Sequence, residues 1–318
     1  MRPGHSRAQL RLPPVQRGAA LVVAMLLAAI ATGIVASLLW HQQLWLRQYD
    51  FEHDRIKAQS LARSGIDWAR LILLEDARRN TIDHFGEQWA IRLPATPLET
   101  GEIGGAIIDQ QGLFNVNALV RDGVVQPDIL ARYRRLLQML DLPLELAAAL
   151  GDWVDAKSVP SPSGGAEDAY YSALDPPRLS SNRPLATIEE LALVAGYTPE
   201  RIKRLQPFVT ALPEAAGSAV NVNTAPPEVL AASIEGLSLA DANRLVAGRL
   251  ARPFLNLADF RARLPGSGIT LNEQALRVSS DAFVIRVDVR QGEVRSTGTA
   301  MVLREAGKWP RLVWQMIE

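Results

Sequence analysis

Four carboxylates near the middle of the chain have the spacing to bind a cation. Asp152 and Asp155 are three residues apart, so they are expected to share one face of a helix near its C-terminal end. Glu167 and Asp168 follow a loop rich in Pro, Gly and Ser that could return them to that helix. Carboxylates gathered at one point repel one another unless a cation lies between them, and oxygen ligands on flexible loops suit Ca²⁺.

Other metals and chemistries fit this sequence less well. The chain has no Cys, and its four His residues all precede residue 85, which argues against Zn²⁺ or copper. The spacing of an EF-hand loop is absent, so an alternative stays open: Glu167 and Asp168 cap a short helix at 169–174, and the two Asp side chains are solvated. No nucleophile motif or phosphate-binding loop occurs, and Asp109 has no visible acid–base partner. These observations favour an assembly role over an enzyme.

The composition describes a protein with a substantial core. Of 318 residues, 48% are apolar, and 34 basic residues balance 34 acidic ones. The chain is therefore neither disordered nor built on disulfides. A net charge of zero gives no support to a strongly basic surface for nucleic acid.

An apolar segment near the N-terminus predicts one membrane-spanning helix. Residues 19–40 carry no charged side chain. At about 1.5 Å per residue they extend roughly 33 Å, which matches a hydrocarbon core of about 30 Å. The basic residues Arg2, Arg7, Arg11 and Arg17 precede the segment, and the acidic residues Asp50, Glu52 and Asp54 follow it. The positive-inside rule therefore predicts a cytoplasmic N-terminus. A cleaved secretory signal is the alternative, although its apolar core is usually only about 7 to 15 residues.

The periodicity that follows predicts an α+β fold. Apolar residues recur every three or four positions as far as Arg79, without Pro, so the membrane helix is expected to continue to that point; a break near His41 is the alternative. Alternating or apolar runs predict strands at 103–111, 282–289, 294–303 and 311–317, which together form a small antiparallel sheet. Short helical patterns fill the interval, at 129–140, 143–154, 188–195, 199–212, 226–233, 239–249 and 257–264. The prediction is an α+β fold with a long N-terminal membrane helix packed on a small antiparallel sheet and an inserted α-helical domain.

The start of the apolar segment resembles the leader of type IV prepilin-like proteins. Gln16-Arg17-Gly18 is followed directly by Ala19 and an uncut apolar run. The resemblance implies that a prepilin peptidase cuts after Gly18 and leaves Ala19 as the mature N-terminus; a plain signal anchor is the alternative. Most subunits of such filaments have Glu five residues after the cut, where this chain has Val23. A carboxylate within lipid is usually there to interact with a partner. The absence of this Glu therefore suggests a subunit that has no other subunit ahead of it.

Several motifs together resemble the minor pseudopilin K subunit of type II secretion systems. They are DQQGLFNVNAL at 109–119, GDWVDAKSVPSPSGGAEDAYY at 151–171, Asn182-Arg183-Pro184, Glu190-Leu191 and VNVNT at 220–224. The resemblance implies a non-enzymatic subunit at the tip of the pseudopilus, assembled with the I and J minor pseudopilins to support protein export across the outer membrane. It also implies an inner-membrane protein with a single span and a periplasmic C-terminal part.

The same resemblance implies a domain order and a metal. The expected parts are a leader at 1–18, a transmembrane helix at 19–40, a pseudopilin domain at 41–119 and 276–318, and an inserted helical domain at 120–275. The family is known for calcium in the region of Asp152, Asp155, Glu167 and Asp168. Lys157 stands where the family often has a further acid, so one ligand could be missing.

One segment suggests a different function. Residues 220–265 resemble a helix-hairpin-helix module, which grips the DNA backbone through a Gly-x-Gly hairpin. Here the hairpin is Gly236-Leu237-Ser238, which lacks the second Gly. Five arginines make the segment moderately basic: Arg244, Arg249, Arg252, Arg261 and Arg263. A membrane-anchored protein of DNA binding or uptake is therefore the alternative function, although nucleic acid is not expected as a partner.

Overall fold

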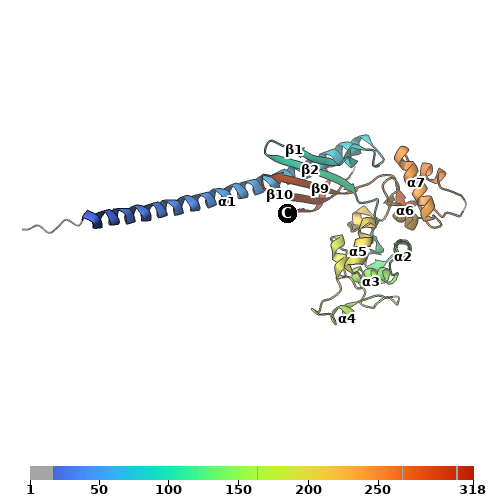
Figure 1. Ribbon diagram of the computed structural model, residues 1–318. Coiled ribbons are helices and arrows are strands. Elements are labelled where there is room, and N and C mark those ends of the chain that lie inside the picture. The colour runs from blue at the N-terminus through green and yellow to red at the C-terminus, as the bar shows by residue number, and fades with distance from the viewer. Residues whose placement is uncertain (1–16, 163, 267, 306) are drawn as a thin grey trace, which may run out of the picture. The chain divides into compact units, whose positions relative to one another are not determined.

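The first helix, α1, runs from Arg17 to Arg79 (Figure 1). A computed structural model describes residues 17–162, 164–266, 268–305 and 307–318. The leader predicted at 1–18 therefore lies almost wholly outside the described residues. In its apolar part, α1 reaches a mean hydropathy of 2.6 with none of that stretch buried, so it is long and apolar enough to cross a membrane. The chain divides into two compact units, Met1–Ile56 and Lys57–Glu318.

A five-stranded antiparallel sheet lies in the second unit. Its order is β1-β2-β9-β10-β11, with β1 at Leu93–Pro97, β2 at Gly101–Asp109, β9 at Ala282–Gln291, β10 at Val294–Leu303 and β11 at Arg311–Ile317. The four predicted strands are confirmed. The strand β1 was not expected, because Pro94 and Pro97 weaken its pattern. Both prolines are tolerated since β1 is an edge strand.

The C-terminal part of α1 packs on this sheet through small side chains. Ala58, Ala62 and Ile66 are almost fully buried and lie at intervals of four residues. Gly65 permits the close approach, since a Cβ there would lie 2.8 Å from Cγ1 of Val287 on β9. Phe283 on the same strand completes this core.

Between β2 and β9 the regular secondary structure is mainly helical, which confirms the predicted α+β class. They are α2 (Pro127–Met139), α3 (Glu145–Val154), α4 (Asp168–Tyr171), α5 (Pro199–Leu205), α6 (Pro227–Ser233), α7 (Leu239–Ala251) and α8 (Leu257–Ala262). A second core forms here, around Tyr133, Trp153 and Tyr171. The helices share the unit Lys57–Glu318 with the sheet. The domain boundaries predicted near 120 and 275 stay a prediction.

Two predicted helices are shorter than the pattern suggested. The segment 188–195 forms a 3₁₀ helix at Ile188–Leu193, and α5 ends at Leu205. After α5 the chain turns through Gln206–Phe208 and enters the short strand β6 (Val209–Thr210), which pairs with β3 (Phe114–Asn115). Pro207 cannot donate a backbone hydrogen bond, so it ends the helix.

Short elements connect the sheet to the helices. Two of them are parallel strand pairs: β3 with β6, and β7 (Val220–Asn221) with β8 (Leu276–Arg277). The pair β4 (Val120–Arg121) and β5 (Val124–Val125) forms a hairpin before α2. A 3₁₀ helix at Gln88–Ala90, η1, lies between α1 and β1.

Candidate functional site

Asp152 lies in the last turn of α3 and is almost fully buried. Its carboxylate accepts hydrogen bonds from the backbone N–H of Ser161 at 2.8 Å and from the Ser161 hydroxyl at 2.6 Å. Gly165 lies against the same carboxylate, since a Cβ at this position would be 2.0 Å from Oδ2 of Asp152. The loop predicted to fold back on α3 therefore does so, and glycine is the residue that fits there.

Glu167 and Asp168 approach this loop from the start of α4. Glu167 is buried; Oε2 lies 3.3 Å from the Ser180 hydroxyl, and Oε1 has no partner among the described residues. Asp168 accepts hydrogen bonds from the backbone N–H and the hydroxyl of Ser180, at 2.9 and 2.7 Å. The side chain of Glu167 makes no capping bond to α4, so the capping alternative does not account for its burial.

The charges of these carboxylates interact, although Asp155 does not lie on the helix as predicted. Asp155 was expected on the helix, but α3 ends at Val154 and Asp155 follows it in extended conformation, accepting a hydrogen bond from the Lys157 backbone. Burial raises the pKa of Glu167 to about 7, with further contributions from the charges of Asp152 and Asp155. Burial also raises the pKa of Asp155, whereas the hydrogen bonds from Ser180 lower that of Asp168.

The four carboxylates do not form the tightest acidic group of the described chain. That group is Asp76, Asp83 and Glu87, which each bring one oxygen within 4.8 Å of the others. The sequence analysis missed it, because none of these residues belongs to a recognisable metal motif. The predicted four are more widely spaced, and metal binding by them stays a prediction.

Polar residues of the quoted motifs join the sheet to the helices. Asp109, at the end of β2, accepts hydrogen bonds from Thr224 at 2.5 Å and from Ser280 at 2.7 Å. Asn221 donates to the hydroxyl of Ser280 and to the backbone carbonyl of Asp83. All are buried, and burial raises the pKa of Asp109. Asp109, which lacked a partner in the sequence, is thus a structural junction residue.

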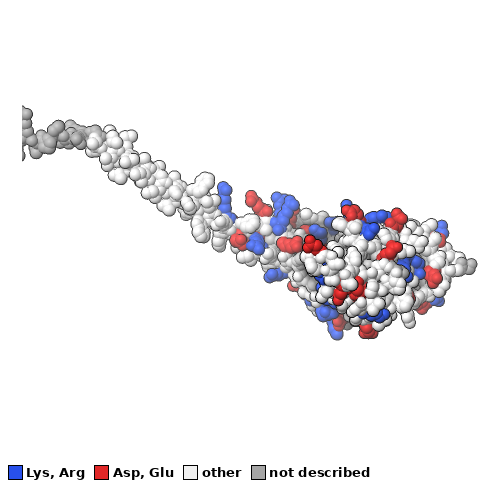
Figure 2. All heavy atoms as spheres, turned by 90° about the horizontal axis from the view of Figure 1, so that it is seen from below, with Lys and Arg blue, Asp and Glu red and all other residues white. Residues whose placement is uncertain are grey.

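The arginines of the helix-hairpin-helix-like segment are engaged by neighbours. Four form ion pairs: Arg244 with Asp241, Arg261 with Glu273, and Arg252 and Arg263 with Asp259. Arg249 is buried and donates to the carbonyl of Val222 at 2.6 Å. Figure 2 shows basic and acidic side chains interspersed on the face in view, without a patch of one sign. These contacts do not favour a surface for nucleic acid.

The turn between α6 and α7 has its own structural reason for glycine. Gly236 has a φ of +84°, and a Cβ there would lie 2.6 Å from the carbonyl oxygen of Gly268. The hairpin glycine is therefore required by backbone conformation and close packing, without any need for a phosphate ligand.

The fold defines a class of membrane-anchored α+β proteins in which a long N-terminal helix packs on an antiparallel sheet interrupted by a helical segment. Two sequence models described as type II secretion system (T2SS), protein K, match residues 112–214 and 220–279, just over half of the chain. The chain belongs to the type II secretion system protein K family, and the resemblance found in the sequence is confirmed.

Curated relatives agree with this assignment over nearly their full lengths. Type II secretion system protein K of Pseudomonas aeruginosa is 34% identical, with 88% of this chain and 86% of the relative covered. The protein K of Klebsiella pneumoniae is 31% identical, with 88% and 90% covered, and that of Aeromonas hydrophila is 29% identical, with 94% and 95% covered. These relatives are named for secretion, and nothing in them favours DNA binding.

A solved structure has the same fold. A chain of the GspK-GspI-GspJ complex from enterotoxigenic Escherichia coli matches with a TM-score of 0.76 and 24% identity, covering 85% of this chain and 99% of that chain. The predicted architecture of helix, sheet and inserted helices is thus found in a known structure.

Proposed function

We propose that this protein is the tip subunit of a type II secretion pseudopilus, where it assembles with I-type and J-type minor pseudopilins to support protein export across the outer membrane. The observation that carries the proposal is the fold shared with a chain of the GspK-GspI-GspJ complex, together with membership of the protein K family. The role is structural, and no catalytic residue is assigned.

The exposed side of α1 supports a protein partner. Trp68 and Leu71 are 53% and 42% exposed, although the opposite side of the helix is buried on the sheet. An apolar groove adjoins them, lined by residues of α1, β2 and the segment before β1, including Ile72, Ile91 and Ile107. A neighbouring pilin-like subunit would remove this apolar surface from water.

The charge pattern supports an orientation in the inner membrane. The arginines before residue 19 and the acids after residue 49 support a cytoplasmic N-terminus and a periplasmic unit Lys57–Glu318. In this proposal the prepilin peptidase cuts between Gly18 and Ala19. Val23, where most such subunits have Glu, is consistent with a subunit that has nothing ahead of it.

Calcium is the proposed cofactor of the helical region, with Asp152, Asp155, Glu167 and Asp168 as its ligands. The unpartnered, buried Oε1 of Glu167 supports a cation there, since a buried oxygen without a partner is costly. Burial raises the pKa of Glu167, and the charges of three nearby carboxylates raise it further; a divalent ion would offset their repulsion. All donors are oxygens, which fits Ca²⁺.

Coexpression tests the proposed assembly. The full-length chain, tagged and extracted in detergent, is expected to retain I-type and J-type subunits of a type II secretion system and to restore secretion to cells that lack their protein K. Failure both to retain these subunits and to restore secretion would contradict the proposal.

A further inference from the structure

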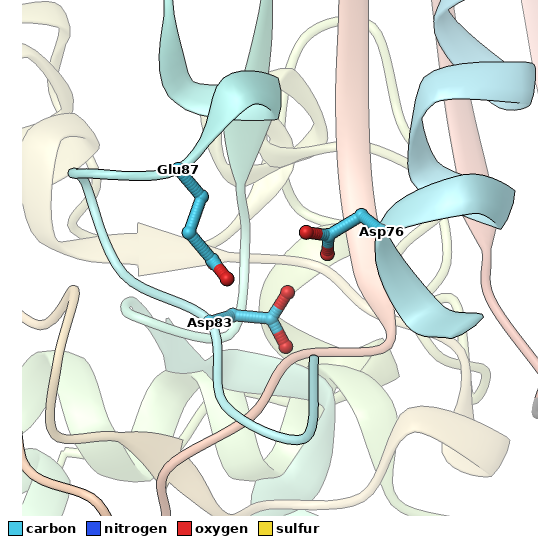
Figure 3. A group of neighbouring side chains, drawn as sticks. All are labelled: Asp76, Asp83 and Glu87. Atoms are coloured by element: carbon cyan, nitrogen blue, oxygen red, sulfur yellow. The ribbon is translucent and has the colours of Figure 1, made fainter. Parts of the chain in front are cut away.

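Asp76, Asp83 and Glu87 meet where the helix α1 joins the sheet (Figure 3). Asp76 is in the last turn of α1, Asp83 follows in the connecting segment, and Glu87 immediately precedes η1. One oxygen from each lies within 4.8 Å of the others. The three residues are 8%, 1% and 7% exposed, so their charges are largely withdrawn from water.

Protein donors satisfy all but one of the six carboxylate oxygens. Arg304, just after β10, donates to Oδ2 of Asp76 at 2.8 Å and to Oδ2 of Asp83 at 2.5 Å. The Asn80 amide donates to Asp76 Oδ1 and to Glu87 Oε1. Oδ1 of Asp83 is buried and has no partner among the described residues. Figure 3 shows the Asp83 carboxylate directed between the other two.

The charges of the group are also unbalanced. Arg304 is the cation that pairs with these carboxylates in the described structure, so one positive charge faces three ionisable acids. Burial raises the pKa of Asp83 to about 6, opposed by Arg304, and burial also raises the pKa of Glu87. A further positive charge at this group would therefore offset the repulsion among the buried carboxylates.

The ligand atoms and access route suit a hard cation. Every candidate donor is a carboxylate oxygen, and a half-turn of the Asn80 amide would present its carbonyl oxygen to the same space. Asp76 and Glu87 also line a surface pocket with Glu75, Asn80 and His84, so the group is reachable from solvent.

We propose that Asp76, Asp83 and Glu87 bind a divalent cation of the calcium type. The ion supplies the missing partner of Asp83 Oδ1 and fastens the end of α1 to the segment before β1. Arg304, just after β10, and Ser280, between β8 and β9, donate hydrogen bonds to the other oxygen of Asp83. The ion therefore also stabilises the chain at these two positions. This site is separate from the four carboxylates of the helical region and does not depend on the proposed function.

Terbium luminescence tests the site in the full-length chain in detergent. The indole N–H of Trp89 donates to Glu87 Oε2 at 2.8 Å, so Trp89 is positioned to sensitise a Tb³⁺ ion held by Glu87. The background is the Asp152→Asn/Glu167→Gln variant, which weakens the other candidate site. In this background we expect one calcium ion per chain by equilibrium dialysis, and Tb³⁺ emission that calcium displaces.

Two further variants separate binding from signal. Trp89→Phe is expected to remove most of the sensitised emission while calcium stays bound, and Asp83→Asn to remove both. Glu75→Gln, which alters an acid of the same pocket that pairs with Arg78, serves as the matched control and should change neither. Absence of calcium from the background variant, or emission and binding that survive Asp83→Asn, would overturn the proposal. Circular dichroism verifies that each variant is folded.

Discussion

The side-chain amide of Asn117 forms two reciprocal hydrogen bonds with the backbone of Leu185. Asn117 Oδ1 accepts from the Leu185 N–H and Nδ2 donates to the Leu185 carbonyl, both at 2.8 Å. The same Nδ2 lies 3.1 Å from the carbonyl of Leu212. One buried amide thus serves as the pairing partner for two distant segments that have no regular strand there.

Asn117→Ala is expected to destabilise the protein by about 2–3 kcal/mol, because it leaves buried backbone groups of Leu185 and Leu212 without partners. Urea unfolding followed by tryptophan fluorescence measures the change. Asn243→Ala is the matched control, since Asn243 is exposed on α7 and bonds locally to Leu239. Equal losses in the two variants would show that the Asn117 amide has no special role.

Local periodicity was sufficient to predict much of this fold. The apolar spacing of α1 and the alternation in β9 and β10 reflect burial on one side of each element, which is visible in the sequence. The return of Gly165 toward Asp152 also followed from the composition of the intervening loop. Each of these features depends on residues that are close together in the sequence, so the sequence alone could indicate it.

Long-range contacts were not predictable in the same way. Asp83 and Arg304 are 221 residues apart, and neither has a pattern that indicates the other. The motif 220–224 pointed to a family, but its use as a polar junction depends on Asp109 and Ser280, which only the folded chain brings together. The end of α3 at Val154 likewise moved Asp155 off the helix on which its spacing had placed it.

Asp109→Asn is expected to make stability less dependent on pH. Burial raises the pKa of Asp109 in the folded protein above the 3.8 of an ordinary Asp. Between these two pKa values the folded form holds a proton that the unfolded form releases, so stability falls as the pH rises from about 4 through the raised pKa of the folded form. The variant lacks this contribution, while its hydroxyl neighbours Thr224 and Ser280 can reverse their hydrogen bonds.

Urea titrations at a series of pH values measure this effect as the difference between wild type and variant. Other buried acids, such as Glu167, contribute to both proteins and cancel in the comparison. Parallel stability curves would contradict a raised pKa at Asp109.

Leu71→Lys is expected to reduce the association with the I-type and J-type subunits while leaving the fold intact, since Leu71 is exposed on the side of α1 away from the sheet. Leu61 and Ile72 are less suitable, because both also pack against the sheet core. Co-purification from detergent measures retention. Leu250→Lys on α7 is the control, at a residue 74% exposed, and should retain the partners.

Gly18→Leu is expected to block removal of the leader, because the proposed prepilin cleavage lies between Gly18 and Ala19. Intact-mass spectrometry of membrane protein should find Ala19 at the N-terminus of the wild type and the uncut chain in the variant. A wild-type protein that keeps its leader, or is cut beyond Trp40, would contradict processing as a prepilin.

Calcium is expected to raise the melting temperature through the carboxylates of the helical region. An ion that binds only the folded form adds stability of RT ln(1 + [L]/Kd), about 2.7 kcal/mol at a hundredfold excess over Kd. The measurement uses the Asp83→Asn variant, so that the second proposed site does not contribute. Its melting temperature should rise in calcium, change less in magnesium, and fall in EDTA.

Adding Asp152→Asn and Glu167→Gln to that variant should abolish the calcium-dependent shift. It should also relieve part of the repulsion among the carboxylates in the metal-free protein, because shape is kept while charge is removed. Glu189→Gln neutralises an exposed acid of the same region and should leave the shift unchanged. Identical melting curves in calcium and EDTA would contradict a metal at these residues, since solvated carboxylates respond only to ionic strength. A shift that survives both substitutions would instead mean that the ion binds elsewhere.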